Sequence, residues 1–139
     1  MNPYKLFPSE MAAICERPDD DVPRIRFAEL LDTTDNPLLH AREEYIRVQC
    51  ALARQNLSEH SWGNLYEREE SLESRYTEEW WASDLPELKG VRFNSAFQRG
   101  FPYEIWCDDE TAFVNHAETL LTSQPIRSLS FMQLGSTNF

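Results

Sequence analysis

The chain has 139 residues, of which 41% are hydrophobic and 27% are charged. This balance is typical of one soluble globular domain and excludes a collagen-like, disordered or membrane chain. With 24 acidic and 13 basic side chains, the formal net charge is −11. That charge argues against electrostatically driven binding to DNA, RNA or anionic lipid. A chain of this length can bury a core large enough to fold without a metal or a disulfide.

Targeting and cysteine signals indicate a cytoplasmic protein. No apolar run approaches the roughly 18 to 20 residues that a bilayer crossing needs. The start, Met-Asn-Pro-Tyr-Lys-Leu-Phe-Pro, is too short and too interrupted by proline for a signal peptide. Cys15, Cys50 and Cys107 are widely spaced and odd in number, so we expect no disulfide framework and a reducing compartment.

Two short helices are expected first. Ser9 can cap a helix that ends near Arg17, before a proline. The triplet Asp19-Asp20-Asp21 supplies a cap and a first-turn negative charge for a second helix, which ends at Asp32. The apolar side of the second helix is expected to comprise Val22, Ile25, Phe27, Leu30 and Leu31.

The strongest helix follows the cap-then-proline signal Asn36-Pro37 and runs from about Leu38 to Gln55. Arg42 and Gln49 project into its broad apolar arc, so both need buried partners if that side is packed. The nearest acidic candidates for Arg42 are Glu29 and the aspartate triplet. The arc itself comprises Leu38, Ala41, Tyr45, Val48, Gln49 and Leu52, widened by Leu39, Ile46 and Ala53.

The chain changes character near residue 90. A helical stretch over 62–76 precedes it, with a possible further turn from Thr77. Beyond Pro86 and Gly90, the spacing changes to strands over 91–93 and 101–107. Asp108 or Asp109 can cap a helix over 113–121, and a further strand over 126–131 follows, so a βαβ unit with a parallel pair is expected.

Two stretches resemble the bacterial repeat-companion domain family. They are residues 11–31, which include Ala13-Ile14 and Pro18-Asp19-Asp20-Asp21-Val22-Pro23-Arg24, and residues 41–50, which begin Ala41-Arg42-Glu43-Glu44-Tyr45-Ile46-Arg47. The family pattern is A-I-x-x-x-P-D-D-D-x-P-R-L-x-Y-A-D-W-L followed by R-A-E-F-I-R-x-Q, and Glu29-Leu30 stands where the family has Asp-Trp. Arg99-Gly100-Phe101 is similar to the R-G-F segment that often follows in such proteins.

The resemblance implies a helical module joined to a leucine-rich-repeat-like cap, and no catalytic residues. Together with the residue patterns it gives an α+β fold: about four helices, then a small βαβ cap. We expect one domain over 1–139, with the helical module over 9–83 and the strand–helix–strand segment over 90–134. Proteins built from such pieces usually present a surface to another protein.

Catalytic and metal chemistry has little support in the sequence. The histidines at 40, 60 and 116 have no second ligand at short spacing. A nucleophile pair of Cys107 and His116 is disfavoured because Cys107 lies on the apolar side of a strand pattern. The paired carboxylates mostly mark solvated faces or helix caps, and four glycines form no phosphate loop. We therefore expect no enzyme, no cofactor and no metal.

The adjacent indoles of Trp80 and Trp81 cannot easily both face inward on a helix. One of them, ringed by Glu78, Glu79 and Asp84, is the candidate anchor for a protein partner with a basic face. The leading hypothesis is a non-enzymatic interaction or regulatory module. The alternative is an acidic mimic of nucleic acid that inhibits or regulates a nucleic-acid enzyme. A hidden enzyme site comes third.

Overall fold

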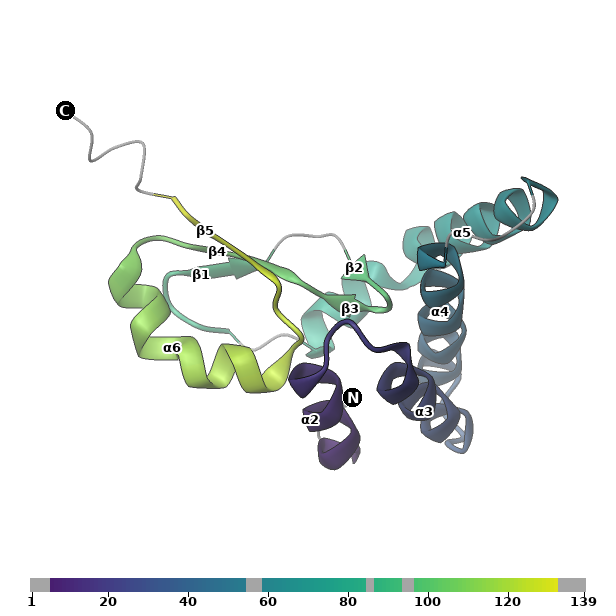
Figure 1. Cartoon of the computed structure of the whole chain (residues 1–139), viewed down its shortest axis with the longest axis horizontal. Helices are drawn as coiled ribbons and strands as arrows, with labels where there is room; N and C mark the ends of the chain where they lie inside the picture. Colours follow the sequence, from purple (N-terminus) through teal and green to yellow (C-terminus); the bar gives the residue numbers. More distant parts are fainter. Residues whose placement is uncertain (1–5, 55–58, 85–86, 94–96, 133–139) are drawn as a thin grey trace.

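A computed structural model gives the fold and describes residues 6–54, 59–84, 87–93 and 97–132. Helix and sheet are combined as the sequence predicts, and the class is α+β. Figure 1 shows helices α2 to α5 on one side of the molecule and the sheet with α6 on the other. In chain order the elements are α2 (Pro8–Glu16), α3 (Asp21–Asp32), α4 (Pro37–Ala53), α5 (Glu59–Asp84), β1 (Val91–Phe93), β2 (Phe97–Gln98), β3 (Phe101–Pro102), β4 (Glu104–Cys107), α6 (Glu110–Ser123) and β5 (Ser128–Phe131).

Side-chain caps begin three of these helices where the residue types predict them. Asp20, Asn36 and Asp109 each accept a hydrogen bond of 2.9 Å from a backbone N–H two or three residues later. The prediction of a Ser9 cap is wrong. Helix α2 already begins at Pro8, whose fixed φ suits the first helical turn, and no side chain caps it.

Helix α4 is central to the helical half, where it packs against both α3 and α5. The predicted burial of Arg42 and Gln49 is confirmed. On α3 the predicted apolar side is wrong at Val22, which is 62% exposed. Arg24 lies on the buried side of α3 instead, because positions 24, 27, 28 and 31 share one helical face.

Helix α5 is one continuous helix of 26 residues, so the stretch expected over 62–76 and the further turn from Thr77 belong to the same helix. The Thr77 hydroxyl donates to the carbonyl oxygen of Glu73, so its polar group is satisfied inside the helix. Leu72 and Trp80, eight positions apart, are both buried on the side facing α4. No helix in the described residues is both long enough and apolar enough to cross a membrane.

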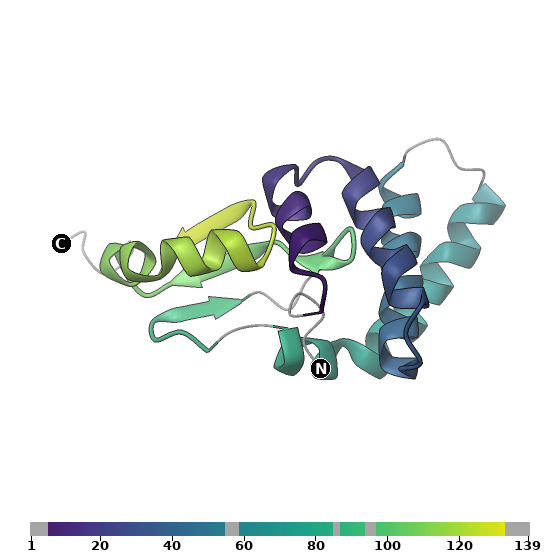
Figure 2. The ribbon, with the colours of Figure 1, turned by 90° about the horizontal axis from the view of Figure 1, so that it is seen from below.

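The three-stranded sheet has the order β1-β4-β5. Strand β1 pairs antiparallel with β4, from Val91 opposite Cys107 to Phe93 opposite Ile105. Strands β4 and β5 are parallel, with Ile105 opposite Leu129, and α6 connects them. Figures 1 and 2 show α6 along one face of this sheet. The strand expected over 101–107 is divided at Tyr103, because β3 pairs with β2 in a separate hairpin.

Within the described residues three apolar clusters form the core, and the β2–β3 hairpin belongs to the helical ones. The first cluster joins α2, α3 and α4 and includes Phe101 of β3. The second joins α4 and α5 and includes Phe97 of β2. The third is smaller and centres on Ile105, Cys107 and Leu120, between the sheet and α6. The hairpin therefore joins the two halves of the chain.

Candidate functional site

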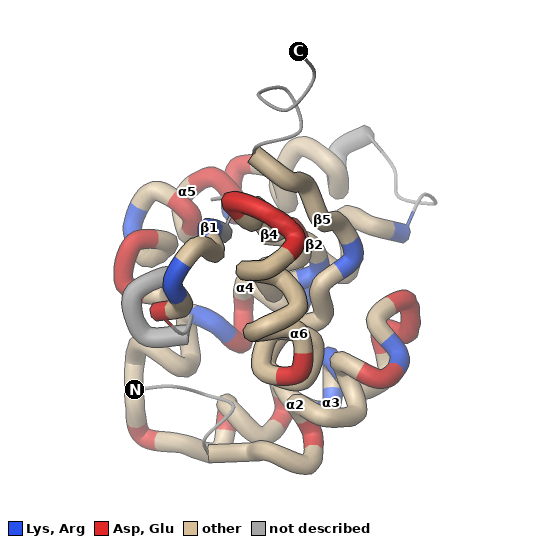
Figure 3. The backbone as a smooth tube through the Cα atoms, turned by 90° about the vertical axis from the view of Figure 1, so that its left-hand side faces the viewer, with Lys and Arg blue, Asp and Glu red and all other residues tan. Residues whose placement is uncertain are grey.

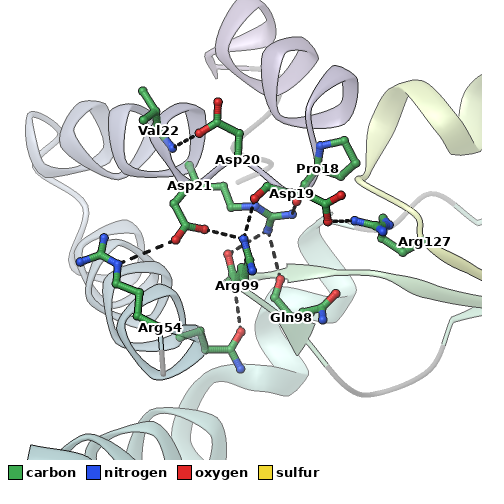
Figure 4. Close-up of polar contacts among 12 residues, drawn as sticks. Pro18, Asp19, Asp20, Asp21, Val22, Arg54, Gln98, Arg99 and Arg127 are labelled. Carbon is green, nitrogen blue, oxygen red and sulfur yellow. Dashed lines mark hydrogen bonds and ion pairs between the residues drawn. The ribbon is translucent and has the colours of Figure 1, made fainter. Parts of the chain in front are cut away.

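The segments that carry the sequence motifs meet at one polar junction, although they are far apart in the chain. The segment between α2 and α3 faces the turn between β2 and β3 (Figure 4). Helix α4 completes the site from the side. We call this set of residues the junction: Asp19, Asp21, Arg24, Arg42, Gln49, Arg99 and Gly100.

The aspartate triplet binds arginines from distant parts of the chain. Arg99 Nη1 donates to a carboxylate oxygen of Asp21 at 2.9 Å and to the backbone carbonyl of Asp19 at 2.8 Å. Arg127 forms an ion pair with the Asp19 carboxylate, and Arg54 lies 3.9 Å from Asp21 (Figure 4). The triplet therefore caps α3 and also ties α3 to the hairpin and to the start of β5.

Arg24 is the buried cation at the centre of the junction, with only 2% of its surface exposed. Its Nη1 donates to the carbonyl oxygens of Gln98 and Arg99 at 3.1 and 3.0 Å, and its Nη2 donates to that of Pro18 at 2.9 Å. Burial lowers the pKa of the guanidinium from 12.5 to about 10, so Arg24 stays charged at neutral pH. Its hydrogen bonds are directed at backbone, which holds the hairpin turn in place.

Arg42 and Gln49 grip the peptide groups of Gly100 from two turns of α4. Arg42 Nε donates to the Gly100 carbonyl at 3.0 Å, and the Gly100 N–H donates to Gln49 Oε1 at 2.7 Å. The Arg42 guanidinium also lies 5.3 to 5.4 Å from the ring centroids of Trp80, Phe97 and Phe101. The acceptor of this hydrogen bond from Arg42 is a backbone carbonyl, whereas the sequence predicted an acidic partner, either Glu29 or the aspartate triplet.

Gly100 is required at the closest approach between the hairpin and α4. Its φ is +90°, a conformation that side-chain-bearing residues rarely adopt. A Cβ placed there would lie 2.4 Å from Cγ1 of Ile46 and 2.8 Å from its Cα. Because the second contact is with backbone, a rotamer change of Ile46 cannot relieve it. The glycine thus sets the distance at which the two halves dock.

The three cysteines are thiols at neutral pH, as expected of packing residues. Burial raises the pKa of Cys15 to about 11 and that of Cys50 to about 12, and it also raises the pKa of Cys107. Cys50 and Cys107 are buried, and Cys15 is partly buried against the first cluster. Among the described residues, no three His, Cys, Asp or Glu side chains are grouped closely enough to hold a metal ion.

The structure contradicts one residue of the predicted partner surface and leaves others exposed. Trp80 is buried, 2% exposed, and packs against Tyr45, Tyr76 and Phe97, so it is core and not an exposed anchor. Glu78 and Glu79 are exposed, as is Glu29. The side chains of the other two predicted partner residues, Trp81 and Asp84, lie outside what the structure describes.

Arg24, Arg99 and Gly100 are the junction residues whose roles sequence reasoning missed. A signal for Arg24 exists, because it stands three, four and seven positions before Phe27, Ala28 and Leu31 on one helical face. No local signal exists for the hairpin turn, since its partners lie more than 50 positions away along the chain. The junction is chemically a set of structural contacts, in which arginines donate to backbone carbonyls and carboxylates, although the buried Nε of Arg24 has no described acceptor.

Comparisons with known proteins identify no relative of this chain. No family model matches the chain, and no curated protein and no solved structure is significantly similar to it. The likeness to the repeat-companion domain therefore rests on the motifs quoted above. The structure places those motifs around the junction, where residues 18–24, 42, 49 and 99–100 are in contact.

Proposed function

We propose that this protein is a cytoplasmic, non-enzymatic module that binds another protein through an acidic surface. The junction supports this proposal because its polar groups are used in holding the two halves of the chain together. An interaction module needs a fixed frame of this kind on which to present a surface. The strand–helix–strand unit β4–α6–β5 is proposed to be the leucine-rich-repeat-like cap of that frame.

The observation that carries the proposal is the crowding of carboxylates on α5. Glu67, Glu70 and Glu78 are exposed on the helix face opposite to the buried Leu72 and Trp80. None of these three carboxylates is in a described ion pair. Figure 3 shows acidic residues recurring along α5. We name Glu67, Glu70 and Glu78 the acidic row.

The crowding on α5 has an electrostatic effect at Glu73, which lies on the same helix. Burial raises the pKa of Glu73, and the negative charges of Glu69 and Glu70 raise it further. Like charges three or four positions apart on a helix repel each other. A partner with a basic face would reduce the repulsion between these carboxylates. Binding would therefore be favoured by the loss of a repulsion that is present in the free protein.

The test is affinity capture of the tagged full chain from its own cells, at low and moderate salt, with mass spectrometry of the retained proteins. The variant Glu67→Gln/Glu70→Gln/Glu78→Gln is expected to lose a specific partner that the unmodified chain retains. A matched control, Glu16→Gln/Glu29→Gln/Glu118→Gln, removes the same number of exposed charges elsewhere and is expected to retain it. Equal retention by both variants, or an empty capture with the unmodified chain, contradicts the proposal.

The same acidic row also suits the alternative function, a mimic of nucleic acid on a basic groove. Competition separates the two. If excess DNA or RNA displaces the captured partner, the row occupies a nucleic-acid site on that partner. If binding persists in excess polynucleotide, the partner's basic face serves protein binding alone.

A further inference from the structure

A hollow between α4 and α5 is lined by more basic than acidic side chains. Its volume is about 230 Å³, and its walls include His40 and Glu44 from α4 and Arg68 and Arg75 from α5. Pockets for drug-sized ligands begin at roughly 300 Å³, so this hollow suits a smaller molecule. Two guanidinium groups thus share a small space with one carboxylate, in a protein of net charge −11.

The carboxylate in the hollow is already neutralised. Glu44 accepts from Nε and Nη2 of Arg68, the second bond being 2.6 Å long. A guanidinium carries five N–H donors, so the two N–H groups of Arg68 Nη1 are not used by this pairing. Arg75 is exposed, and no carboxylate in the described part of the chain forms an ion pair with it. The uncompensated charge of the hollow is therefore positive.

An apolar wall lies beside these cations. The buried Leu72 and the partly buried Tyr76 line the same hollow. That ring is held in place because it stacks on Trp80, with 5.4 Å between centroids and 21° between planes. The Arg75 guanidinium lies 5.4 Å from the centroid of the same ring. Cation and fixed ring together form a surface for a flat molecule that carries a negative group.

We propose that this hollow is a binding site for a small organic anion, a phosphate or carboxylate group attached to a ring. The anionic group would pair with the guanidinium of Arg75 and with the unused Nη1 of Arg68. The ring of the ligand would lie against Leu72 and Tyr76. The site is separate from the acidic row and does not rest on the proposed partner.

The test is a ¹H–¹⁵N NMR titration of the full chain at constant ionic strength, with phenyl phosphate, benzoate, inorganic phosphate and phenol as separate probes. A ring-bearing anion is expected to cause saturable changes in the amide chemical shifts of residues 40–44 and 68–76 only. Inorganic phosphate is expected to bind the same residues more weakly, and phenol is expected to cause no change. The stronger of phenyl phosphate and benzoate identifies the anionic group. Arg75→Gln is expected to weaken binding about tenfold, which is the loss of one charge-assisted contact.

The control is Arg92→Gln, which removes an exposed arginine from β1 in the other half of the molecule and is expected to leave the affinity unchanged. Both positions are exposed, so neither variant disturbs the core. Shifts that do not saturate, shifts centred outside the hollow, or equal affinities for the two variants would overturn the proposal.

Discussion

The helical half (residues 6–84) and the sheet half (residues 87–132) are stabilised to different extents by apolar packing. The helical half contains two clusters built on large side chains, among them Phe27, Tyr45 and Trp80. The sheet half contains one smaller cluster around Ile105 and Leu120. Yet the β2–β3 hairpin, which by sequence belongs with the strands, packs its two phenylalanines into the helical clusters. The hairpin therefore interrupts the sheet half, because Leu88 and Val91 before it already pack on the third cluster.

The contacts that connect the two halves differ in chemistry from the apolar clusters inside each half. Besides the two packed phenylalanines, they include buried cations that donate to backbone carbonyls, as Arg24 and Arg42 do. Hydrogen bonds depend on direction and apolar contacts do not, so this connection fixes the orientation of the hairpin. The comparison predicts that substitutions at the junction affect both halves and that substitutions in the small cluster affect one.

The largest effect is expected from Gly100→Ala. The added methyl group meets the backbone of Ile46 and must adopt a positive φ, which together cost about 4 kcal/mol of unfolding free energy. Urea unfolding followed by tryptophan fluorescence measures it. Gly63→Ala is the control, because nothing lies within 4 Å of that Cβ inside α5, and it should stabilise by up to about 1 kcal/mol. A loss below 1 kcal/mol for Gly100→Ala would show that the hairpin is not closely docked.

Leu120→Ala tests whether the sheet half can open by itself. Removing this buried side chain from the small cluster is expected to cost about 3 kcal/mol. Hydrogen exchange should accelerate at the amides of β4 and β5 while those of α4 remain protected. The neighbouring Leu121→Ala, at a half-exposed position, should change little. Equal acceleration in α4 would mean that the two halves unfold as one unit.

Arg24→Met is expected to cost about 2 kcal/mol. Methionine fills much of the same space but leaves the carbonyl oxygens of Gln98, Arg99 and Pro18 without their donor. The melting temperature measures the loss, and Arg26→Met, on the exposed side of α3, is the matched control. If the two variants have the same melting temperature, the buried guanidinium of Arg24 does not stabilise the contact between the halves.

The smallest effect concerns the exposed pair of Glu44 and Arg68. The hydrogen bond from Arg68 lowers the pKa of Glu44 below its usual 4.5 in the folded protein. A lowered folded-state pKa means that the stabilisation is present above pH 4.5 and is lost as the pH falls through the folded value. Glu44→Gln should therefore destabilise by less than about 1 kcal/mol at pH 7 and by nothing once the carboxylate is protonated. An equal difference at low pH would contradict the assignment.

Local patterns predicted much of the helical structure in both halves because they act over one or two turns. Asp20, Asn36 and Asp109 cap the expected helices, and the placement of Arg42 and Gln49 on the buried side of α4 is confirmed. The Ser9 cap and the burial of Val22 were mispredicted for a related reason. A residue type such as serine can cap a helix, and an apolar side chain can be buried. Whether it does so depends on where the helix begins and on which elements pack against it.

By itself, the sequence determined the class of the fold, the caps of α3, α4 and α6 and the parallel pairing of β4 with β5, since these follow from spacing and from neighbouring residues. Only the tertiary structure decided that Trp80 is core, that Arg42 binds the Gly100 carbonyl, and that a glycine must stand at position 100. Those outcomes depend on groups that lie 35 to 58 positions apart in the chain, and their contact exists only once the halves have packed.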